Sequence, residues 1–514
     1  MTRGWLISIS ALALAFPAAL AQIQSQGPLK LDSGRVSGAL TGVNNDISVY
    51  KGIPYVASPT GELRWRAPQP VKAWEGVRDA TKFGAICPQR EGRGGDVQSE
   101  DCLFLNVWTP AKGASQKLPV MVWVHGGGFT YGSGSSRIYD GTRLAEHGVI
   151  VVTLNYRLNI LSGFAHPVLS RESEHGSGNY GLLDQIAALK WVQRNIKEFG
   201  GDPANVTLFG ESAGGLSVSA LLVSPQTKGL IEKAIVESGS GTRITTQESA
   251  EKTGQEFVKQ MGLENDANGI AKLREKSWKN LPNAQNYRGA PVLDGWAFTD
   301  DPINVWAKGK QLNAPMIVGY NHDEATFFMA RDGDIPKTAD EFQASVRKRY
   351  ADAAGQLLAL YPVKTDDDVY WSEISVRTER GMGLNARLQL RGMSTVPAKA
   401  YEYHFSHLPE VVADPKRGVS HASELVYVFG TIPANADAGS RQMSEAIMNY
   451  WTQFAKTGDP NQAGLPQWPR FQKGNEAYLE LKNPIHAAKD LNKDKLDIFE
   501  KVQQQNAAPR SSGN

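Results

Sequence analysis

One stretch in the middle of the chain, residues 199–214, restricts the possible folds more than any other part of the sequence. A β-prone run at residues 206–209 leads directly into Gly210-Glu211-Ser212-Ala213-Gly214, and residues 216–223 can continue as a helix. This strand, turn and helix pattern is typical of a nucleophile elbow, where glycines permit a turn too sharp for side chains. It predicts a strained backbone at Ser212 with an exposed hydroxyl, and a helix N-terminus whose amide groups face any anion formed there.

Apolar runs alternate with helical patterns along most of the chain. Strands are expected at residues 105–108, 120–124, 149–154, 206–209, 233–236, 316–319 and 401–405. Helices are expected where Leu182, Ile186, Leu189, Val192 and Ile196 recur at helical spacing, at 216–223, and at 444–456 before Gly458. Strands that are apolar throughout are typical of a parallel sheet covered on both faces. The predicted fold class is therefore α/β, with a mostly parallel central sheet and helices on both faces.

Three segments depart from this alternation. Residues 34–55 contain short alternating runs separated by Gly42 and Asn44-Asn45, which predicts an antiparallel hairpin at the edge of the sheet. Residues 245–310 and 330–395 are more polar and helical in composition, and we expect them to form helical excursions above the sheet and the active site. Since no internal repeat or low-complexity linker interrupts the chain, residues 22–514 are predicted to form a single domain.

The N-terminus, residues 1–21, has the pattern of a secretory signal peptide. Arg3 supplies the positive start, residues 5–16 form an apolar run, and Ala19-Leu20-Ala21 is a cleavage site before Gln22. A membrane anchor is the alternative, but the run is too short to span a bilayer and no stop-transfer pattern follows. The mature protein is therefore predicted to be secreted or periplasmic, with no membrane span after cleavage.

Predicted export allows the chain's two cysteines, Cys87 and Cys102, to be interpreted. They enclose a polar, Gly-rich stretch, and in an oxidising compartment such a pair is most simply a disulfide. Closing a loop of this size stabilises a fold by roughly 3 kcal/mol on the chain-entropy estimate. A metal site would need further ligands of the same kind nearby, and the sequence offers none there.

A serine nucleophile needs a base that takes its proton and a carboxylate that orients this base. In nucleophile-elbow enzymes the acid and then the histidine follow the serine along the chain. His404 and His407 lie on or just after a predicted strand, and His486 lies in a polar C-terminal stretch. His421 lies in a loop before an apolar run, which is where such a base belongs.

Candidates for the acid and for an oxyanion hole also follow predicted strands. Asp323 and Glu324 come directly after the strand at 316–319, and spacing does not choose between them. For either one, a solvated loop carboxylate is the plain alternative. Gly126-Gly127-Gly128 follows the strand at 120–124, and its bare N–H groups could hold a developing oxyanion. A tight turn is the alternative there; a phosphate loop would need the pattern G-x-x-x-x-G-K-[ST], which is absent.

Taken together, these motifs make the chain resemble the type B carboxylesterases, the family of the cholinesterases and the bacterial para-nitrobenzyl esterases. The likeness runs from about Gly34 to the C-terminal region. It is carried by Ser99-Glu100-Asp101-Cys102-Leu103-Phe104-Leu105-Asn106-Val107, by His125-Gly126-Gly127-Gly128-Phe129, by Gly178-Asn179-Tyr180-Gly181-Leu182-Leu183-Asp184-Gln185 and by the elbow stretch. The elbow stretch and the Glu-Asp-Cys-Leu motif are highly specific together. The resemblance implies an α/β-hydrolase fold.

The resemblance also implies roles for individual residues. It makes Ser212 the nucleophile, Glu324 rather than Asp323 the acid, and His421 the base. It further implies an oxyanion hole from the N–H groups of Gly127, Gly128 and Ala213, a disulfide between Cys87 and Cys102, and positions beside the triad for Glu211 and Ser238. Ala325 is a departure, since many relatives have Gly after the acid.

The sequence as a whole predicts an exported serine carboxylesterase that hydrolyses small-molecule esters without a metal or organic cofactor. One alternative is a non-catalytic binding protein on the same fold, although such relatives typically lack the nucleophile. Another is an amidase that uses the same triad. The 55 Lys and Arg residues nearly balance 53 Asp and Glu residues, so neither nucleic acid nor an anionic membrane is an expected partner. Nothing in the sequence sets an oligomeric state.

Overall fold

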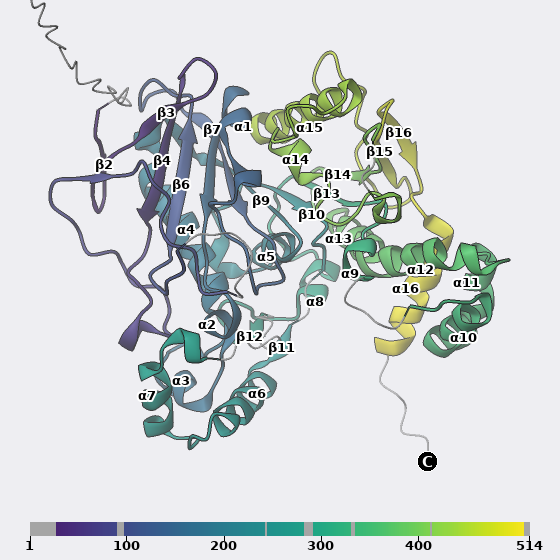
Figure 1. The fold of residues 1–514 in the computed structure, drawn as a ribbon, viewed down its shortest axis with the longest axis horizontal. Coiled ribbons are helices and arrows are strands. Elements are labelled where there is room, and N and C mark those ends of the chain that lie inside the picture. The colour runs from purple at the N-terminus through teal and green to yellow at the C-terminus, as the bar shows by residue number, and fades with distance from the viewer. Residues whose placement is uncertain are drawn as a thin grey trace, which may run out of the picture.

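The structure is a computed structural model that describes residues 27–89, 97–241, 244–281, 291–329, 335–411 and 414–507. A central sheet of eleven strands dominates it (Figure 1). In spatial order the strands are β16 (His486–Lys489), β15 (Ala477–Leu481), β14 (Ala400–Phe405), β13 (Met316–Asn321), β10 (Lys233–Glu237), β9 (Gly201–Glu211), β7 (Leu118–Val124), β8 (Ile150–Leu154), β6 (Phe104–Thr109), β4 (Ile47–Pro54) and β3 (Ala39–Thr41).

The middle of this sheet is parallel and its two edges are antiparallel. Every neighbouring pair from β15 across to β8 is parallel, whereas β16, β6, β4 and β3 pair in the antiparallel sense. The predicted α/β class with a mostly parallel sheet is therefore confirmed. The edge hairpin consists of β3 and β4 alone, because residues 34–37 form β2 (Gly34–Ser37) of a small second sheet with β1 (Leu29–Leu31) and β5 (Val77–Asp79).

Helices cover both faces of the sheet, as predicted. Along β7, Val120 and Val122 point to one face and Met121 and Trp123 to the other, because successive side chains of a strand alternate. The first face packs against α4 (Tyr180–Asn195) and α5 (Ala213–Leu221). The second face packs against α1 (Thr142–Glu146), α14 (Leu425–Val428) and α15 (Ala438–Thr457). Gly458 ends α15 in a left-handed conformation, at φ 75°.

The two excursions are helical, as expected. The first contains α6 (Gln247–Gln260), α7 (Ala267–Glu275), α8 (Pro302–Ala307) and the short pair β11 (Thr245–Thr246) and β12 (Val292–Leu293). Its α6 and α7 share an apolar cluster with α2 (Asn159–Gly163) and α3 (Pro167–Arg171). The second contains α10 (Ala339–Tyr350), α11 (Ala354–Leu360), α12 (Val369–Thr378) and α13 (Leu384–Met393). It packs on α16 (Lys493–Ala507) and adjoins α9 (Thr326–Met329).

Two of the motif residues are held by buried ion pairs. Glu100 pairs with Arg64, and Asp184 pairs with Arg157 at 2.7 Å. Arg157 also donates its main-chain N–H to Asp184 at 3.0 Å, which ties α4 to the loop after β8. These acidic residues of the quoted motifs thus stabilise the scaffold. Removing one partner of such a pair would leave a buried charge uncompensated.

The disulfide predicted between Cys87 and Cys102 is present, and both cysteines are buried in the core. The predicted signal peptide, residues 1–21, lies outside the described residues. Within the described ranges, no helix combines the length and the apolar composition that crossing a membrane requires.

Candidate active site

Ser212 occupies the turn between β9 and α5, at φ 55° and ψ −120°. Residues other than glycine rarely adopt this region, so the backbone is strained. A Cβ at Gly210 would lie 2.7 Å from the carbonyl oxygen of Val124, and one at Gly214 only 1.9 Å from the same atom. Because these contacts are with the main chain of β7, a side chain has no room on either flank of the serine. The side chain of Ser212 itself is partly exposed.

Unused main-chain donors lie around this turn. Within the described part of the chain, the N–H groups of Gly127, Gly128 and Ala213 donate no hydrogen bond. Ala213 is the first residue of α5, where helix N–H groups lack an internal partner. The loop that carries Gly126 passes close to the serine, since a Cβ at Gly126 would lie 3.1 Å from the Cβ of Ser212. Such donors can stabilise negative charge that develops beside Ser212.

The loop of residues 125–129, which we call the glycine loop, is held in place by Tyr156. Gly127 and Gly128 have φ values of 107° and 64°, which glycine adopts without strain. The buried ring of His125 stacks on the ring of Tyr156 with centroids 4.4 Å apart. The Tyr156 hydroxyl donates to the carbonyl oxygen of His125 at 2.8 Å. The loop therefore meets the serine in a fixed conformation.

Glu324 and His421 are in direct contact, although 97 positions separate them. Glu324 lies on the loop after β13 and His421 on the loop before α14, and Oε2 of the acid is hydrogen-bonded to Nδ1 of the imidazole. The other oxygen, Oε1, accepts from the Ser238 hydroxyl and from the main-chain N–H of Asn321. Both side chains are buried, with His421 only 4% exposed. The acid is thus oriented to hold the imidazole.

The second imidazole nitrogen of His421 faces the elbow. Its Nε2 lies 3.0 Å from Oε1 of Glu211, the residue directly before Ser212. Among the described residues, no hydrogen bond joins the Ser212 hydroxyl to His421. Catalytic hydrogen bonds are often long without substrate and tighten in the complex. The structure therefore brings Glu324, His421 and the elbow together, and leaves the contact between His421 and Ser212 unmade.

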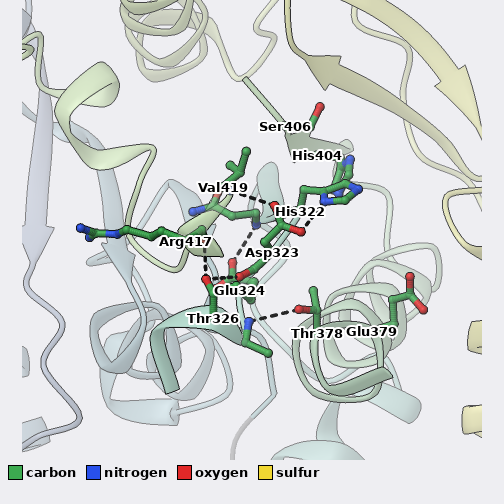
Figure 2. A network of polar contacts seen from close by, with 12 residues as sticks. His322, Asp323, Glu324, Thr326, Thr378, Glu379, His404, Ser406, Arg417 and Val419 are labelled. Atoms are coloured by element: carbon green, nitrogen blue, oxygen red, sulfur yellow. Dashed lines mark hydrogen bonds and ion pairs between the residues drawn. The ribbon is translucent and has the colours of Figure 1, made fainter. Parts of the chain in front are cut away.

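Asp323 and Glu324, which sequence spacing does not distinguish, have different partners. Glu324 contacts His421, as described above, whereas the Asp323 carboxylate accepts from the N–H of Val419 at 2.8 Å. Its second oxygen contacts Nδ1 of His322 at 2.8 Å (Figure 2). Asp323 therefore touches the loop that carries His421, and Glu324 touches the imidazole.

The other late histidines have partners elsewhere. His404 contacts Glu480 at 3.0 Å and His407 contacts the Ser440 hydroxyl at 3.1 Å, while His486 is exposed on β16. In the ranges that the structure describes, no group of three or more His, Cys, Asp or Glu side chains is arranged to hold a metal ion.

Two buried glutamates near the site are absent from the sequence-based prediction. Glu237 ends β10 and accepts from the indole N–H of Trp451 at 2.7 Å, and Glu424 accepts from the side chain of Asn321. Burial raises the pKa of Glu237 to about 8 and raises the pKa of Glu424 well above its usual range. A charged residue that closes the otherwise apolar run 234–236 could have pointed to Glu237.

Two aromatic rings line one side of the imidazole. The rings of Phe327 and Phe328 lie 5.5 and 5.0 Å from the ring of His421, between centroids. Both side chains are half-buried, so they offer apolar surface next to the site. The apolar part of a substrate can pack against such a surface.

The carboxylates around His421 lead to a pH prediction. Burial alone would lower the pKa of His421, but Glu211 and Glu324 outweigh it and raise that pKa to about 9. Glu211→Gln removes one of these negative charges, so the pKa of His421 should fall. A base acts only when neutral, and the acidic limb of the pH profile of kcat/KM should therefore move to lower pH.

This shift is measured from kcat/KM between about pH 5 and 10 for the parent and the variant. Glu402→Gln is the matched control, because Glu402 is equally buried but lies on β14, where the charges that act on it are those of Glu476 and Arg387. Its acidic limb should coincide with that of the parent. An acidic limb in Glu211→Gln that stays in place or moves to higher pH would contradict the prediction.

Comparison with known proteins matches most of the chain to one protein family. A sequence model of the carboxylesterase family matches residues 25–499. The chain is 37% identical over 493 residues to the para-nitrobenzyl esterase of Bacillus subtilis, covering 90% of this chain and 96% of that one. It is 36% identical over 496 residues to the fumonisin B1 esterase of Sphingopyxis macrogoltabida, covering 92% and 89%. A solved PNB esterase superposes with a TM-score of 0.80 at 36% identity, over 92% of this chain and 100% of that chain.

Proposed function

Because this chain belongs to the carboxylesterase family and is a carboxylic ester hydrolase of the α/β-hydrolase fold, we propose that it cleaves small-molecule esters through an acyl-enzyme on Ser212. The observation that carries the proposal is the buried contact between Glu324 and His421, directly beside a strained serine at the elbow. A serine with a strained backbone, a histidine and a carboxylate are the parts of a nucleophilic triad.

In the proposed reaction, the Ser212 oxygen attacks the ester carbonyl while Nε2 of His421 takes the hydroxyl proton. Nε2 of His421 lies next to Oε1 of Glu211 in the structure. For this step it must turn away from Glu211 and accept a hydrogen bond from the hydroxyl of Ser212, the next residue. His421 then gives the proton to the leaving alcohol, and the acyl-enzyme forms. Water, deprotonated by the same imidazole, then attacks the acyl carbon. The bond between this carbon and the Ser212 oxygen breaks, His421 returns its proton to that oxygen, and the carboxylic acid is released. Glu324 keeps the imidazole oriented and stabilises its cationic form.

In this reaction the N–H groups of Gly127, Gly128 and Ala213 would form the oxyanion hole. Its support is that these donors are unused in the described structure and that the glycine loop runs against Ser212. Ser238 would steady Glu324 through its hydroxyl, and Glu211 would sit beside the imidazole. We also propose export; the signal-peptide pattern at residues 1–21 and the disulfide support it.

Labelling with a fluorophosphonate tests the proposed nucleophile directly. The reagent phosphonylates an activated serine, so one label per chain should appear on the peptide that carries Ser212, and ester hydrolysis should fall in proportion. The measurement is peptide mapping by mass spectrometry alongside residual activity. Labelling of a different serine, or full activity in the labelled protein, would overturn the assignment.

A preference for choline esters is not expected. In cholinesterases, the loop closed by the matching disulfide carries an aromatic residue that stacks on the quaternary ammonium. The sequence from Pro88 to Asp101 contains no Trp, Tyr or Phe. The catalytic efficiency for butyrylthiocholine should therefore be no higher than for its neutral 3,3-dimethylbutyl analogue. A clear advantage of the charged thioester in a matched thiol-release assay would refute this prediction.

A further inference from the structure

The loop that carries Glu324 and the loop that carries His421 are joined by Asp323. We call residues 322–325 the acid loop and residues 417–421 the histidine loop. The main-chain N–H of Asp323 donates to the carbonyl oxygen of Val419 at 2.9 Å. In return, the N–H of Val419 donates to the Asp323 carboxylate at 2.8 Å. Asp323 thus pairs with both main-chain groups of Val419, two positions before His421 (Figure 2).

Two further hydrogen bonds reach the histidine loop close to Asp323. The Thr326 hydroxyl donates to the carbonyl oxygen of Arg417 at 2.8 Å, and the side-chain amide of Asn321 donates to that of Ser420 at 2.9 Å. Asp323 and Val419 are both buried, with exposed fractions of 7% and 3%. Asn321 ends β13 and Thr326 begins α9, so the histidine loop is bonded to the residues on both sides of the acid loop as well as to Asp323.

The histidine loop has a glycine where the Asp323 carboxylate approaches. Gly418 has a φ of 54°, and a Cβ there would lie 2.4 Å from Oδ2 of Asp323. Any larger residue would displace the oxygen that accepts from Val419. The glycine at position 418 of the histidine loop therefore leaves the space that the Asp323 carboxylate occupies.

We propose that Asp323 is a positioning residue, whose carboxylate holds the histidine loop where the His421 imidazole meets Glu324. The inference rests on the proposed function, since it presumes that His421 is the base. The two neighbouring carboxylates then have different roles. Glu324 orients the imidazole itself, and Asp323 fixes the main chain that carries it.

The expected consequence follows from the chemistry of a buried N–H group. Without the Asp323 carboxylate, the N–H of Val419 has no acceptor, and the loop must shift to find one. A displacement of about 1 Å in a catalytic group can cost about 100-fold in rate. His322 contacts the other oxygen of Asp323 and makes its own main-chain bond to Phe405, so it does not touch the histidine loop through these contacts.

The test compares kcat, KM and thermal unfolding for a p-nitrophenyl ester across a set of variants. Asp323→Ala should lower kcat by about 30- to 100-fold with KM within about threefold of the parent. Asp323→Asn keeps an oxygen that can accept from Val419 and should recover most of kcat. The acidic limb of the kcat/KM profile should also move to lower pH in Asp323→Ala, because Glu324 no longer lies as close to the imidazole.

Gly418→Ala perturbs the contact between Asp323 and Val419 from the histidine loop. It tests the positioning role if Asp323→Ala fails to fold. It should reduce kcat in the same way as Asp323→Ala. Gly61→Ala is its matched control, because Gly61 has a φ of 57° and a Cβ added there would meet nothing within 4 Å. A side chain would be strained by the positive φ at both positions, and only at Gly418 would it also clash. A loss of kcat in Gly61→Ala equal to that in Gly418→Ala would assign the effect to strain alone and overturn the inference.

Glu324→Gln separates this inference from the proposed function. If Glu324→Gln loses about 10⁴-fold while Asp323→Ala and Gly418→Ala keep the parent kcat, the positioning role is wrong and the triad stands. If Asp323→Asn is the severe variant and Glu324→Gln is mild, Asp323 is the acid and the proposed triad itself fails. Loss of kcat in Asp323→Ala, with recovery in Asp323→Asn and a severe Glu324→Gln, supports both.

Discussion

Ser212→Ala is expected to lower kcat for ester hydrolysis by about 10⁴- to 10⁶-fold, because the remaining site has no oxygen with which to form the acyl-enzyme. The change removes a single hydroxyl from a partly exposed side chain. In the described part of the chain, Nε2 of His421 makes no hydrogen bond to that hydroxyl, so the fold should remain intact. The measurements are kcat with a p-nitrophenyl ester and the midpoint of thermal unfolding, together with fluorophosphonate labelling, which should disappear.

Ser217→Ala provides the matched control for this experiment. Ser217 is a buried serine of α5, and its hydroxyl accepts from the side chain of Gln185 at 3.1 Å. It has no part in the proposed reaction, so kcat should stay within a fewfold of the parent value. Residual turnover of Ser212→Ala near that of Ser217→Ala would mean that another residue is the nucleophile.

The elbow was predictable from the sequence because local geometry determines it. Glycines are required at 210 and 214 because the turn from β9 into α5 lies against the carbonyl oxygen of Val124 on the neighbouring strand β7. The parallel strands were predictable for a similar reason, since strands buried on both faces must be apolar throughout. The boundaries were less predictable, because β9 begins at Gly201, five residues before the apolar run that marks it.

The choice between Asp323 and Glu324 could not be made from spacing. The two carboxylates are neighbours on one loop, and what separates them is the partner that each one meets across the fold. Glu324 meets an imidazole 97 positions later, and Asp323 meets the backbone of Val419, 96 positions later. Contacts of this range depend on how β13 and β14 stack the loops at their ends, which single-sequence patterns do not encode.

The buried glutamates were missed for a related reason. In a sequence, Glu237 and Glu424 look like ordinary surface charges, because acidic residues are almost never fully buried without a partner. In the structure Trp451 and Asn321 supply those partners from elements more than 100 positions away. Only the position of Glu237 at the end of an apolar strand hinted at burial.

The second large effect is expected for folding, in Gly214→Ala. The new methyl group would lie 1.9 Å from the carbonyl oxygen of Val124 and 3.0 Å from that of His125, both main-chain atoms of β7 or its end. We expect the free energy of unfolding to fall by more than about 3 kcal/mol, or no folded protein to form. The measurement is denaturant unfolding followed by circular dichroism. Gly355→Ala in α11 is the control, since its Cβ would meet nothing within 4 Å and alanine favours a helix by roughly 1 kcal/mol.

The size of this effect depends on whether α5 can move away from β7. Its far side is also in contact, because a Cβ at Gly215 would lie 2.8 Å from the carbonyl oxygen of Glu237 on β10. The N–H of Ser212 donates to that same carbonyl oxygen at 2.9 Å, so the turn is tied to β10 as well. A helix held between two strands cannot relieve a clash by shifting, and the strained Ser212 cannot relax for the same reason. If Gly214→Ala were as stable as the parent, the start of α5 would have to be mobile, and the strain at Ser212 would have no structural support.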